Sequence, residues 1–162
     1  MTTQTDTSVS TSIDVDVPVD RAFKVFTADI GSWWNADHHI IEAKLERMVF
    51  EPRVGGHIYD LGVDGSECRW ATVLAYDPPR RLVFSWNINL EWRLETDPER
   101  VSEVEVTFDP RPEGGTHVTL THSELQRHGD GWESMRGSIA SDGGWPGGLR
   151  LFAAYVGGES GA

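Results

Sequence analysis

The stretch ECRWATVLAYDPPRRLVFSWNI, residues 67–88, predicts the clearest element of the chain, a β-hairpin. Two runs rich in β-branched and aromatic residues flank the tetrapeptide Asp77-Pro78-Pro79-Arg80. This tetrapeptide is typical of a turn, because each proline lacks a backbone N–H and fixes its own φ angle. After the turn, one strand face carries Leu82, Phe84, Trp86 and Ile88. Before the turn, alternation leaves open which face is covered; it groups Trp70 with Thr72, Leu74 and Tyr76.

A second hairpin is predicted where VSEVEVTFDP (residues 101–110) and GGTHVTLTHSEL (residues 114–125) flank a turn rich in proline and glycine. Both runs alternate between apolar and polar side chains, as half-buried strands do. The inner face carries Val104, Val106, Phe108, Val118, Leu120 and His122, and the outer face carries Glu103, Glu105, Thr107, Thr119 and Thr121. An antiparallel sheet of this kind keeps one face in water, so another element must cover the other face.

The chain before residue 67 predicts one strand, two short helices and two further strands. The run SIDVDVP (residues 12–18) alternates as a half-buried strand. Pro18 then suits the first position of a helix, and the two short helices end at about residue 36. Residues 40–50 favour a strand, and the Gly55-Gly56 turn precedes another short strand.

The covering element is expected near the C-terminus, in the run WPGGLRLFAAYV (residues 145–156). Helical spacing places Trp145, Leu149, Phe152 and Val156 on one apolar stripe. A shorter helix is predicted before it, over residues 129–140. Each glycine of the Gly147-Gly148 pair weakens the long helix by about 1 kcal/mol relative to alanine. Two compensating benefits stay open, namely close approach of the helix to the sheet and clearance for a ligand.

These elements predict one α+β domain that pairs an antiparallel sheet of about six strands with a long final helix. The length of 162 residues leaves little room for a second domain. Residues 1–9 are rich in Thr, Ser and Gln and are expected to be disordered. The domain is expected to cover residues 10–157, and a flexible tail is expected over residues 158–162.

The composition argues against several classes of partner. A formal net charge of −12 disfavours a nucleic-acid surface, which needs clustered Lys and Arg, and docking on anionic membranes. Cys68 is the sole cysteine, so an intramolecular disulfide is excluded. No apolar run approaches the roughly 20 residues of a membrane helix. The N-terminus also lacks the basic and apolar regions of a signal peptide, so we expect a cytoplasmic protein.

The spacing of potential ligands predicts neither a metal site nor a phosphate loop. His38 and His39 are adjacent and cannot readily converge on one ion, and the HExxH and CxxC patterns are missing. The glycine pairs at 55–56 and 114–115 are placed in β turns rather than between a strand and a helix. We therefore expect no metal and no cofactor. Cys68 has no neighbouring lysine and is expected to be a buried or half-buried, inert thiol.

The order of elements and several phrases resemble the START-like superfamily (SRPBCC), whose fold is also called birch-pollen-allergen-like. Within it, the chain is similar to the family related to the C-terminal domain of the chaperone-ATPase activator. The matching phrases are VDVPVDRAFKVFTADIGSWW, RVGG, VLAYDPPRRLVFSW, VEVTFDP, GGTHVTLTHSEL and GWPGGLRLFAAYV. They extend over nearly the whole expected domain, and the separation of DPPRRLVFSW from GGTHVTLTHSEL makes the match specific.

The resemblance implies a helix-grip fold, in which a curved sheet of six to seven strands wraps around the long C-terminal helix. It also implies a hydrophobic cavity between sheet and helix, but it carries over no fixed catalytic motif. The residues expected to line the cavity are Trp34, Tyr59, Trp70, Phe84, Trp86, Trp92, Phe108, Leu120, His122, Trp145, Leu149 and Phe152. Trp92 is expected in a loop or strand end at the cavity mouth.

No residue is assigned a catalytic role, and the weak candidates are His122, Tyr59 and Glu67. His122 is the most interesting, because a histidine titrates near neutral pH and serves as acid or base. The alternative stays open that His122 is a structural residue whose hydrogen bonds are satisfied inside the core.

The favoured hypothesis is a protein that binds a hydrophobic small molecule, either lipid-like, aromatic or polyketide-like. One alternative is an enzyme of the polyketide aromatase or cyclase kind, and another is a chaperone-ATPase co-factor or interaction module. A chaperone partner is disfavoured, because the sequence shows one domain and no separate chaperone-binding half. The oligomeric state stays open, with a homodimer among the alternatives.

Overall fold

The computed structural model describes residues 7–34 and 41–160. Its strands are β1 (Val9–Val15), β2 (Leu45–Phe50), β3 (His57–Gly62), β4 (Glu67–Asp77), β5 (Arg81–Trp86), β6 (Ser102–Pro110) and β7 (Thr116–Ser123). Its helices are α1 (Val19–Ala28), α2 (Ile30–Trp33), α3 (Trp132–Ala140) and α4 (Trp145–Ser160), with 3-10 turns η1 (Pro98–Arg100) and η2 (Leu125–His128). Among these residues, no helix combines the length and the apolar character that crossing a membrane requires.

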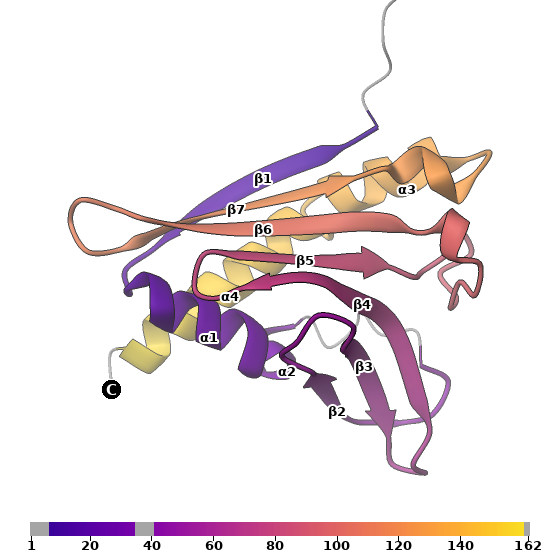
Figure 1. Cartoon of the computed structure of the whole chain (residues 1–162), viewed down its shortest axis with the longest axis horizontal. Helices are drawn as coiled ribbons and strands as arrows, with labels where there is room; N and C mark the ends of the chain where they lie inside the picture. The colour runs from indigo at the N-terminus through magenta and orange to yellow at the C-terminus, as the bar shows by residue number, and fades with distance from the viewer. Residues whose placement is uncertain (1–6, 35–40, 161–162) are drawn as a thin grey trace, which may run out of the picture.

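Within the described part of the chain, seven strands form one curved antiparallel sheet in the order β1-β7-β6-β5-β4-β3-β2. Both predicted hairpins are confirmed, since β4 pairs with β5 and β6 pairs with β7. Strand β1 forms one edge of the sheet and pairs along its whole length with β7, with Ile13 opposite Val118. The α+β helix-grip architecture expected from the sequence is therefore confirmed, with α1 and α2 directly after the first strand (Figure 1).

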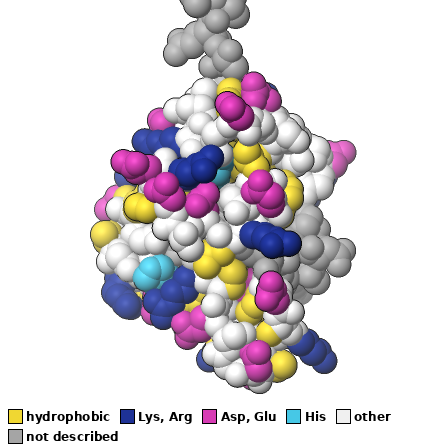
Figure 2. Space-filling model, turned by 90° about the vertical axis from the view of Figure 1, so that its right-hand side faces the viewer, with side chains coloured by type: hydrophobic (Ala, Val, Ile, Leu, Met, Phe, Trp, Pro, Cys, Tyr) yellow, Lys and Arg dark blue, Asp and Glu magenta, His cyan; other side chains and the backbone are white. Residues whose placement is uncertain are grey.

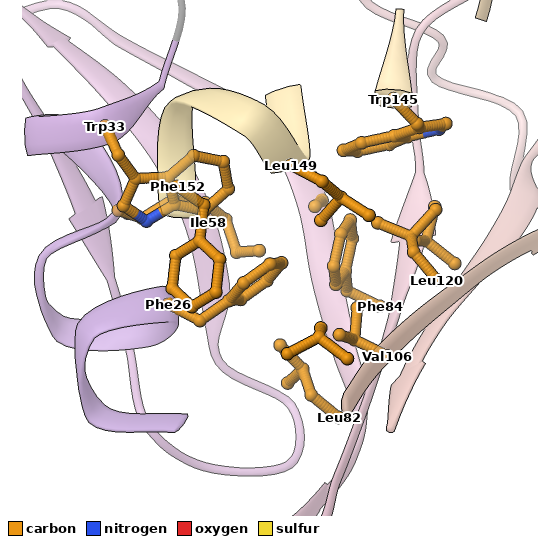
Figure 3. Packing of buried hydrophobic residues seen from close by; sticks show 14 of the residues in the cluster. Phe26, Trp33, Ile58, Leu82, Phe84, Val106, Leu120, Trp145, Leu149 and Phe152 are labelled. Carbon is orange, nitrogen blue, oxygen red and sulfur yellow. The ribbon is translucent and has the colours of Figure 1, made fainter. Parts of the chain in front are cut away.

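Helix α4 covers the inner face of the sheet, as the apolar stripe predicted (Figures 1 and 3). Its four stripe residues, Trp145, Leu149, Phe152 and Val156, are all buried. The apolar side chains of β6 and β7 that face it are completely shielded from water, while their neighbours in sequence stay partly exposed. Figure 3 shows Leu149 of α4 beside Phe84 and Leu120 of the sheet. This burial of apolar area is the main source of stability for the domain.

A bulge in β4 decides the face that alternation left open. Ile58 of β3 pairs with Ala71 but Tyr59 pairs with Arg69, so Trp70 is the extra residue. A bulge shifts the phase of the strand, and residues beyond it change faces. Trp70 and Ala71 are consequently both buried, whereas Leu74, which alternation grouped with Trp70, is exposed. The grouping by simple alternation is therefore corrected.

The ends of the ordered chain differ from the expected boundaries by a few residues. Strand β1 begins at Val9, and the carbonyl of Thr7 already accepts a hydrogen bond from the Leu125 N–H. Residues 7–9, which were expected in the disordered tail, thus belong to the fold. Helix α4 extends to Ser160, beyond the expected end at residue 157. Residues 1–6 and 161–162 of the expected tails lie outside the described residues.

Two glycines at the corner between α3 and α4 permit a close contact of backbones. A Cβ atom added at Gly144 would collide with the carbonyl group of Ile139, and one added at Gly147 would collide with the carbonyl oxygen of Asp142. At Gly148 an added Cβ would meet only the Trp145 ring, at an ordinary distance of 4.0 Å. Gly147 therefore accommodates the incoming chain, so the close approach at this position is to the preceding loop and not to the sheet.

Gly144→Ala is expected to lower the free energy of unfolding by about 1–3 kcal/mol, the usual cost of overpacking. The matched control is Gly137→Ala in α3, where an added Cβ meets no atom within 4 Å. That change is expected to raise the free energy of unfolding by up to about 1 kcal/mol through helix propensity. Urea denaturation followed by circular dichroism measures both, and equal effects of the two substitutions would contradict the corner contact.

Candidate functional site

Five aromatic rings meet inside the domain at the N-terminal end of α4. The Trp86 ring of β5 packs edge-on against His122 of β7 at 5.2 Å between centroids and against Trp145 of α4 at 5.5 Å. Trp70 lies 5.7 Å from Trp86, and Trp34 lies 5.2 Å from Trp70 and 5.8 Å from Trp145. We call these five residues the aromatic cluster. All are buried except Trp34, which is half-buried.

A chain of buried hydrogen bonds leads out of this cluster. The indole N–H of Trp145 donates to Nδ1 of His122 over 3.0 Å. The other ring nitrogen of His122, Nε2, lies 2.7 Å from the Ser102 hydroxyl. The same hydroxyl lies 2.7 Å from Nε2 of His128. Since Ser102, His122 and His128 are all buried, these bonds form without competition from bulk water. We call these three residues the histidine–serine chain.

The direction of every bond in the chain follows from Trp145, because an indole N–H only donates. Nδ1 of His122 must therefore accept, and a neutral His122 carries its proton on Nε2 and donates to Ser102. The Ser102 hydroxyl then donates its own proton to Nε2 of His128. A neutral His128 is left with its proton on Nδ1. The geometry thus fixes the tautomer of His122, and the arrangement in which the Ser102 proton is also paired assigns the proton of His128 to Nδ1.

Two N–H groups beside this chain are buried and lack a hydrogen-bond partner in the described structure. They are Nδ1 of His128 and the indole Nε1 of Trp86. Trp86 is also the direct cross-strand partner of Ser102 in the β5–β6 ladder, so both groups belong to residues that adjoin Ser102. Leaving a buried donor unsatisfied costs about 1–3 kcal/mol, so such groups are few in native structures.

Burial keeps both histidines of the chain neutral. It lowers the pKa of His122 from 6.5 to about 3, and proximity to His128 contributes in the same direction. The pKa of His128 is also lowered, mainly by burial. The Glu95 carboxylate opposes this shift, while the Arg100 guanidinium, which donates to the His128 carbonyl over 3.3 Å, adds to it. Neutral imidazoles are the form that the deduced tautomers require.

Most residues predicted to line a cavity lie on the inner face, between the sheet and the helices. Nine of them are buried there: Trp70, Phe84, Trp86, Phe108, Leu120, His122, Trp145, Leu149 and Phe152. Trp34 joins them in a half-buried position, whereas its neighbour Trp33 turns toward Phe26 and Phe152, with centroids 4.9 and 5.4 Å away. The two adjacent tryptophans thus diverge, because Trp33 ends α2 and Trp34 adopts an extended backbone.

The structure places Tyr59, Glu67 and Trp92 away from the aromatic cluster. Tyr59 alternates with the buried Ile58 and packs under the Arg69 guanidinium on the outer face of the sheet, 5.4 Å from ring centroid to Cζ. Glu67 is exposed and pairs with the same arginine. Trp92 is 44% exposed, in the loop between β5 and β6. Trp92 therefore lies in a loop, as expected, whereas Tyr59 is outside the interior that it was expected to line.

Two participants of the histidine–serine chain, Ser102 and His128, were missed by the sequence analysis. Ser102 continues the inward alternation of Val104, Val106 and Phe108, so its inward position was available from the pattern. His128 had no such signal, because it comes from the short turn η2 and reaches Ser102 only through the tertiary fold.

A separate half-open pocket of about 400 Å³ lies at the surface beside α1. It is lined by Asp20, Phe23, Lys24, Thr27, Ala28, Phe50, Pro52, Tyr76, Pro78 and Pro79. None of the twelve predicted cavity residues belongs to it. Its aromatic wall nevertheless continues into the core, because Phe23 contacts Tyr76 at 5.6 Å and Phe108 at 5.1 Å between centroids. We call it the α1 pocket.

Other chemistry is sparse in the described residues. They hold no group of three or more His, Cys, Asp or Glu side chains placed to bind a metal ion, and His38 and His39 lie outside them. Cys68 is buried, and burial together with the charge of Asp60 raises the pKa of its thiol to about 11. A thiol with so high a pKa is a poor nucleophile. Figure 2 shows acidic and basic side chains interspersed with small hydrophobic areas on the face it presents.

Comparisons with known proteins agree with the family expected from the sequence. A protein-family model described as "Activator of Hsp90 ATPase homolog 1-like protein" matches residues 16–157. A search of curated proteins gave no match. Among solved structures, the anthrahydroquino-γ-pyrone synthase Txn09, complexed with SUM, is 38% identical, with a TM-score of 0.63 over 91% of this chain and 95% of that one.

Two further solved structures extend the comparison. The self-sacrificing resistance protein CalC from Micromonospora echinospora is 28% identical, with a TM-score of 0.68 over 95% of this chain and 96% of that one. Protein NE0264 from Nitrosomonas europaea is 14% identical, with a TM-score of 0.68 over 99% of this chain and 100% of that one. The last likeness concerns the fold alone.

The deduced tautomers are expected to appear in long-range ¹H–¹⁵N NMR spectra of the histidine rings. His122 should carry its proton on Nε2, whereas His128 should carry it on Nδ1. His117 serves as an internal reference, because its Nδ1 lies 2.6 Å from the Asp14 carboxylate and must donate to it. A spectrum with a proton on Nδ1 of His122 would contradict the direction of the chain.

Stability is expected to decrease as the pH falls from about 6.5 to 5, the range in which unfolded histidine takes up its proton. The folded pKa values of His122 and His128 are depressed, so in this range the unfolded chain binds protons that the folded chain does not. Each histidine adds a slope of up to about 1.4 kcal/mol per pH unit. Urea unfolding at several pH values measures the slope of the free energy of unfolding against pH. In His122→Gln this slope should fall by the amount that corresponds to up to about one proton. A slope that is unchanged in this variant would show that His122 titrates normally.

Proposed function

The chain belongs to the family of Activator of Hsp90 ATPase homolog 1-like proteins, and from this premise we propose that it binds a planar, polycyclic aromatic molecule of the polyketide type. The binding site is the inner face of the sheet at the N-terminal end of α4. The observation that carries the proposal is the aromatic cluster, with the unpartnered N–H groups of Trp86 and His128 beside it.

The chemistry of the aromatic cluster suits a flat, ring-shaped ligand. Its rings meet edge-on or tilted, at centroid distances of 5.2 to 5.8 Å, so a flat molecule that enters between them would stack on ring faces. Aromatic contacts add about 0.5–1.5 kcal/mol each beyond the burial of area. Sites for small molecules typically combine such apolar walls with a few polar groups that orient the ligand.

The likeness to Txn09 supports the choice of ligand class. That protein is described as a synthase of an anthrahydroquino-γ-pyrone, a name that denotes fused aromatic and pyrone rings. An identity of 38% over 91% of this chain favours a related ligand for it. The proposal rests on the interior site and this likeness. It makes no use of the chaperone in the family name.

A second candidate function is ring closure on the same kind of molecule. The histidine–serine chain favours it, because neutral imidazoles joined through a hydroxyl can exchange protons over bonds of 2.7 Å. In this function His128, with its unpartnered Nδ1–H, is the group that would exchange a proton with the ligand. Turnover of a linear or partly cyclised polyketide to a pyrone would separate this enzyme from a carrier.

The test of binding uses xanthone and 9,10-anthraquinone as polycyclic probes and palmitate as a lipid probe, in thermal-shift and calorimetric titrations. The polycyclic probes are expected to stabilise the protein by about 2.7 kcal/mol at a hundredfold excess over Kd. Trp86→Phe should weaken their binding about tenfold through the lost ring area and N–H. The matched control is Trp92→Phe, which should leave binding unchanged because Trp92 lies outside the interior.

One further variant separates the interior site from the α1 pocket. Ala28 is an exposed residue that lines this pocket, so Ala28→Tyr fills the pocket without removing a core contact. Unchanged binding in this variant supports the interior site. Loss of binding here, with Trp86→Phe unaffected, would move the ligand to the α1 pocket, and stabilisation by palmitate alone would replace the aromatic ligand with a lipid.

A further inference from the structure

Two unpartnered polar atoms beside the histidine–serine chain share one property. The indole Nε1 of Trp86 is a donor in every state of the side chain. Nε2 of His128 accepts the hydrogen bond from the Ser102 hydroxyl, so a neutral His128 carries its proton on Nδ1, and Nδ1 is a donor. Each of the two atoms can therefore donate a hydrogen bond to an acceptor of the ligand, and neither can accept one.

Three residues hold His128 in this donor state. Trp145 fixes the tautomer of His122, His122 donates to Ser102, and the Ser102 proton is paired when it is donated to His128. Without the hydroxyl of Ser102, His128 would be free to place its proton on either nitrogen, and its Nδ1 would accept as readily as it donates. The histidine–serine chain thus sets the hydrogen-bond polarity of the site.

We propose that the site selects polycyclic ligands by a carbonyl oxygen, which accepts from Trp86 Nε1–H and His128 Nδ1–H, and that Ser102 is the residue that positions His128 for this task. The inference rests on the proposed function and specifies its ligand further. A carbonyl oxygen has two lone pairs and no proton, so it matches two donors. Plain hydrocarbons of the same shape leave both donors unsatisfied, and that loss disfavours their binding.

The experiment compares two tricyclic probes of nearly the same shape. Xanthone carries a ring carbonyl, and xanthene has a methylene group at the same position. The wild-type chain is expected to bind xanthone at least tenfold more tightly than xanthene, as measured by the ratio of their Kd values in calorimetric titrations. The carbonyl stretch of bound xanthone should also move to lower frequency than in an apolar solvent, as hydrogen bonding to the oxygen requires.

Three variants test which residues create this preference. Trp86→Phe removes one donor, and Ser102→Ala frees the tautomer of His128, so both should reduce the xanthone-to-xanthene preference severalfold. The matched control is Ser85→Ala on the neighbouring strand. Ser85 is also buried, but its hydroxyl accepts from the Thr72 N–H and takes no part in the histidine–serine chain. This control should keep the wild-type preference.

The outcomes separate the two levels of the proposal. Tight binding of both probes with a ratio near one would overturn the carbonyl inference and leave the proposed function standing. Failure of both probes to bind would overturn the proposed function. A preference that survives in Trp86→Phe and Ser102→Ala would overturn the assignment of the donors. Because the ratio is first measured on the wild-type chain, the inference is decided even where a variant does not fold.

Discussion

The hydrogen bond from the Trp145 indole to His122 Nδ1 joins the first residue of α4 to strand β7 of the sheet. This bond is buried, and the indole N–H of Trp145 can only donate. It therefore places the proton of His122 on Nε2 and, through Ser102, favours a proton on Nδ1 of His128. The same contact positions the Trp145 ring against Trp86 and Trp34. Packing and hydrogen-bond polarity are therefore coupled at one point, and the candidate site depends on both.

The corner before α4 supports this contact from the other side. Gly144 immediately precedes Trp145 and lets the chain pass against the carbonyl group of Ile139 at the end of α3. A larger residue would push the start of α4 away from its place over the sheet. Gly147, which weakens α4 by propensity, makes the other close contact of this corner, so glycines determine where the helix begins. Their cost is offset by the placement of a tryptophan that the interior network needs.

The interior site and the α1 pocket differ in what they offer a ligand. The α1 pocket is half-open, and three prolines and two phenylalanines contribute to its lining. The interior site is closed, and its unpartnered N–H groups give it a defined polarity. The aromatic side chains of either site can give affinity for flat aromatic molecules. Discrimination among such molecules, however, requires buried polar groups that a wrong ligand leaves unsatisfied. For this reason we propose the interior, and not the α1 pocket, as the place where ligands are discriminated.

The sequence by itself determined the two hairpins, the inward face of β6 and β7 and the apolar stripe of α4, because period-2 and helical patterns are local properties of the chain. It also brought His122, Trp86 and Trp145 into one group. Only the tertiary structure decided the face of Trp70, since a bulge reverses alternation, and only it placed Tyr59, Glu67 and Trp92 outside. It alone revealed His128 as well, because a hydrogen bond between residues 26 positions apart in sequence leaves no periodic trace.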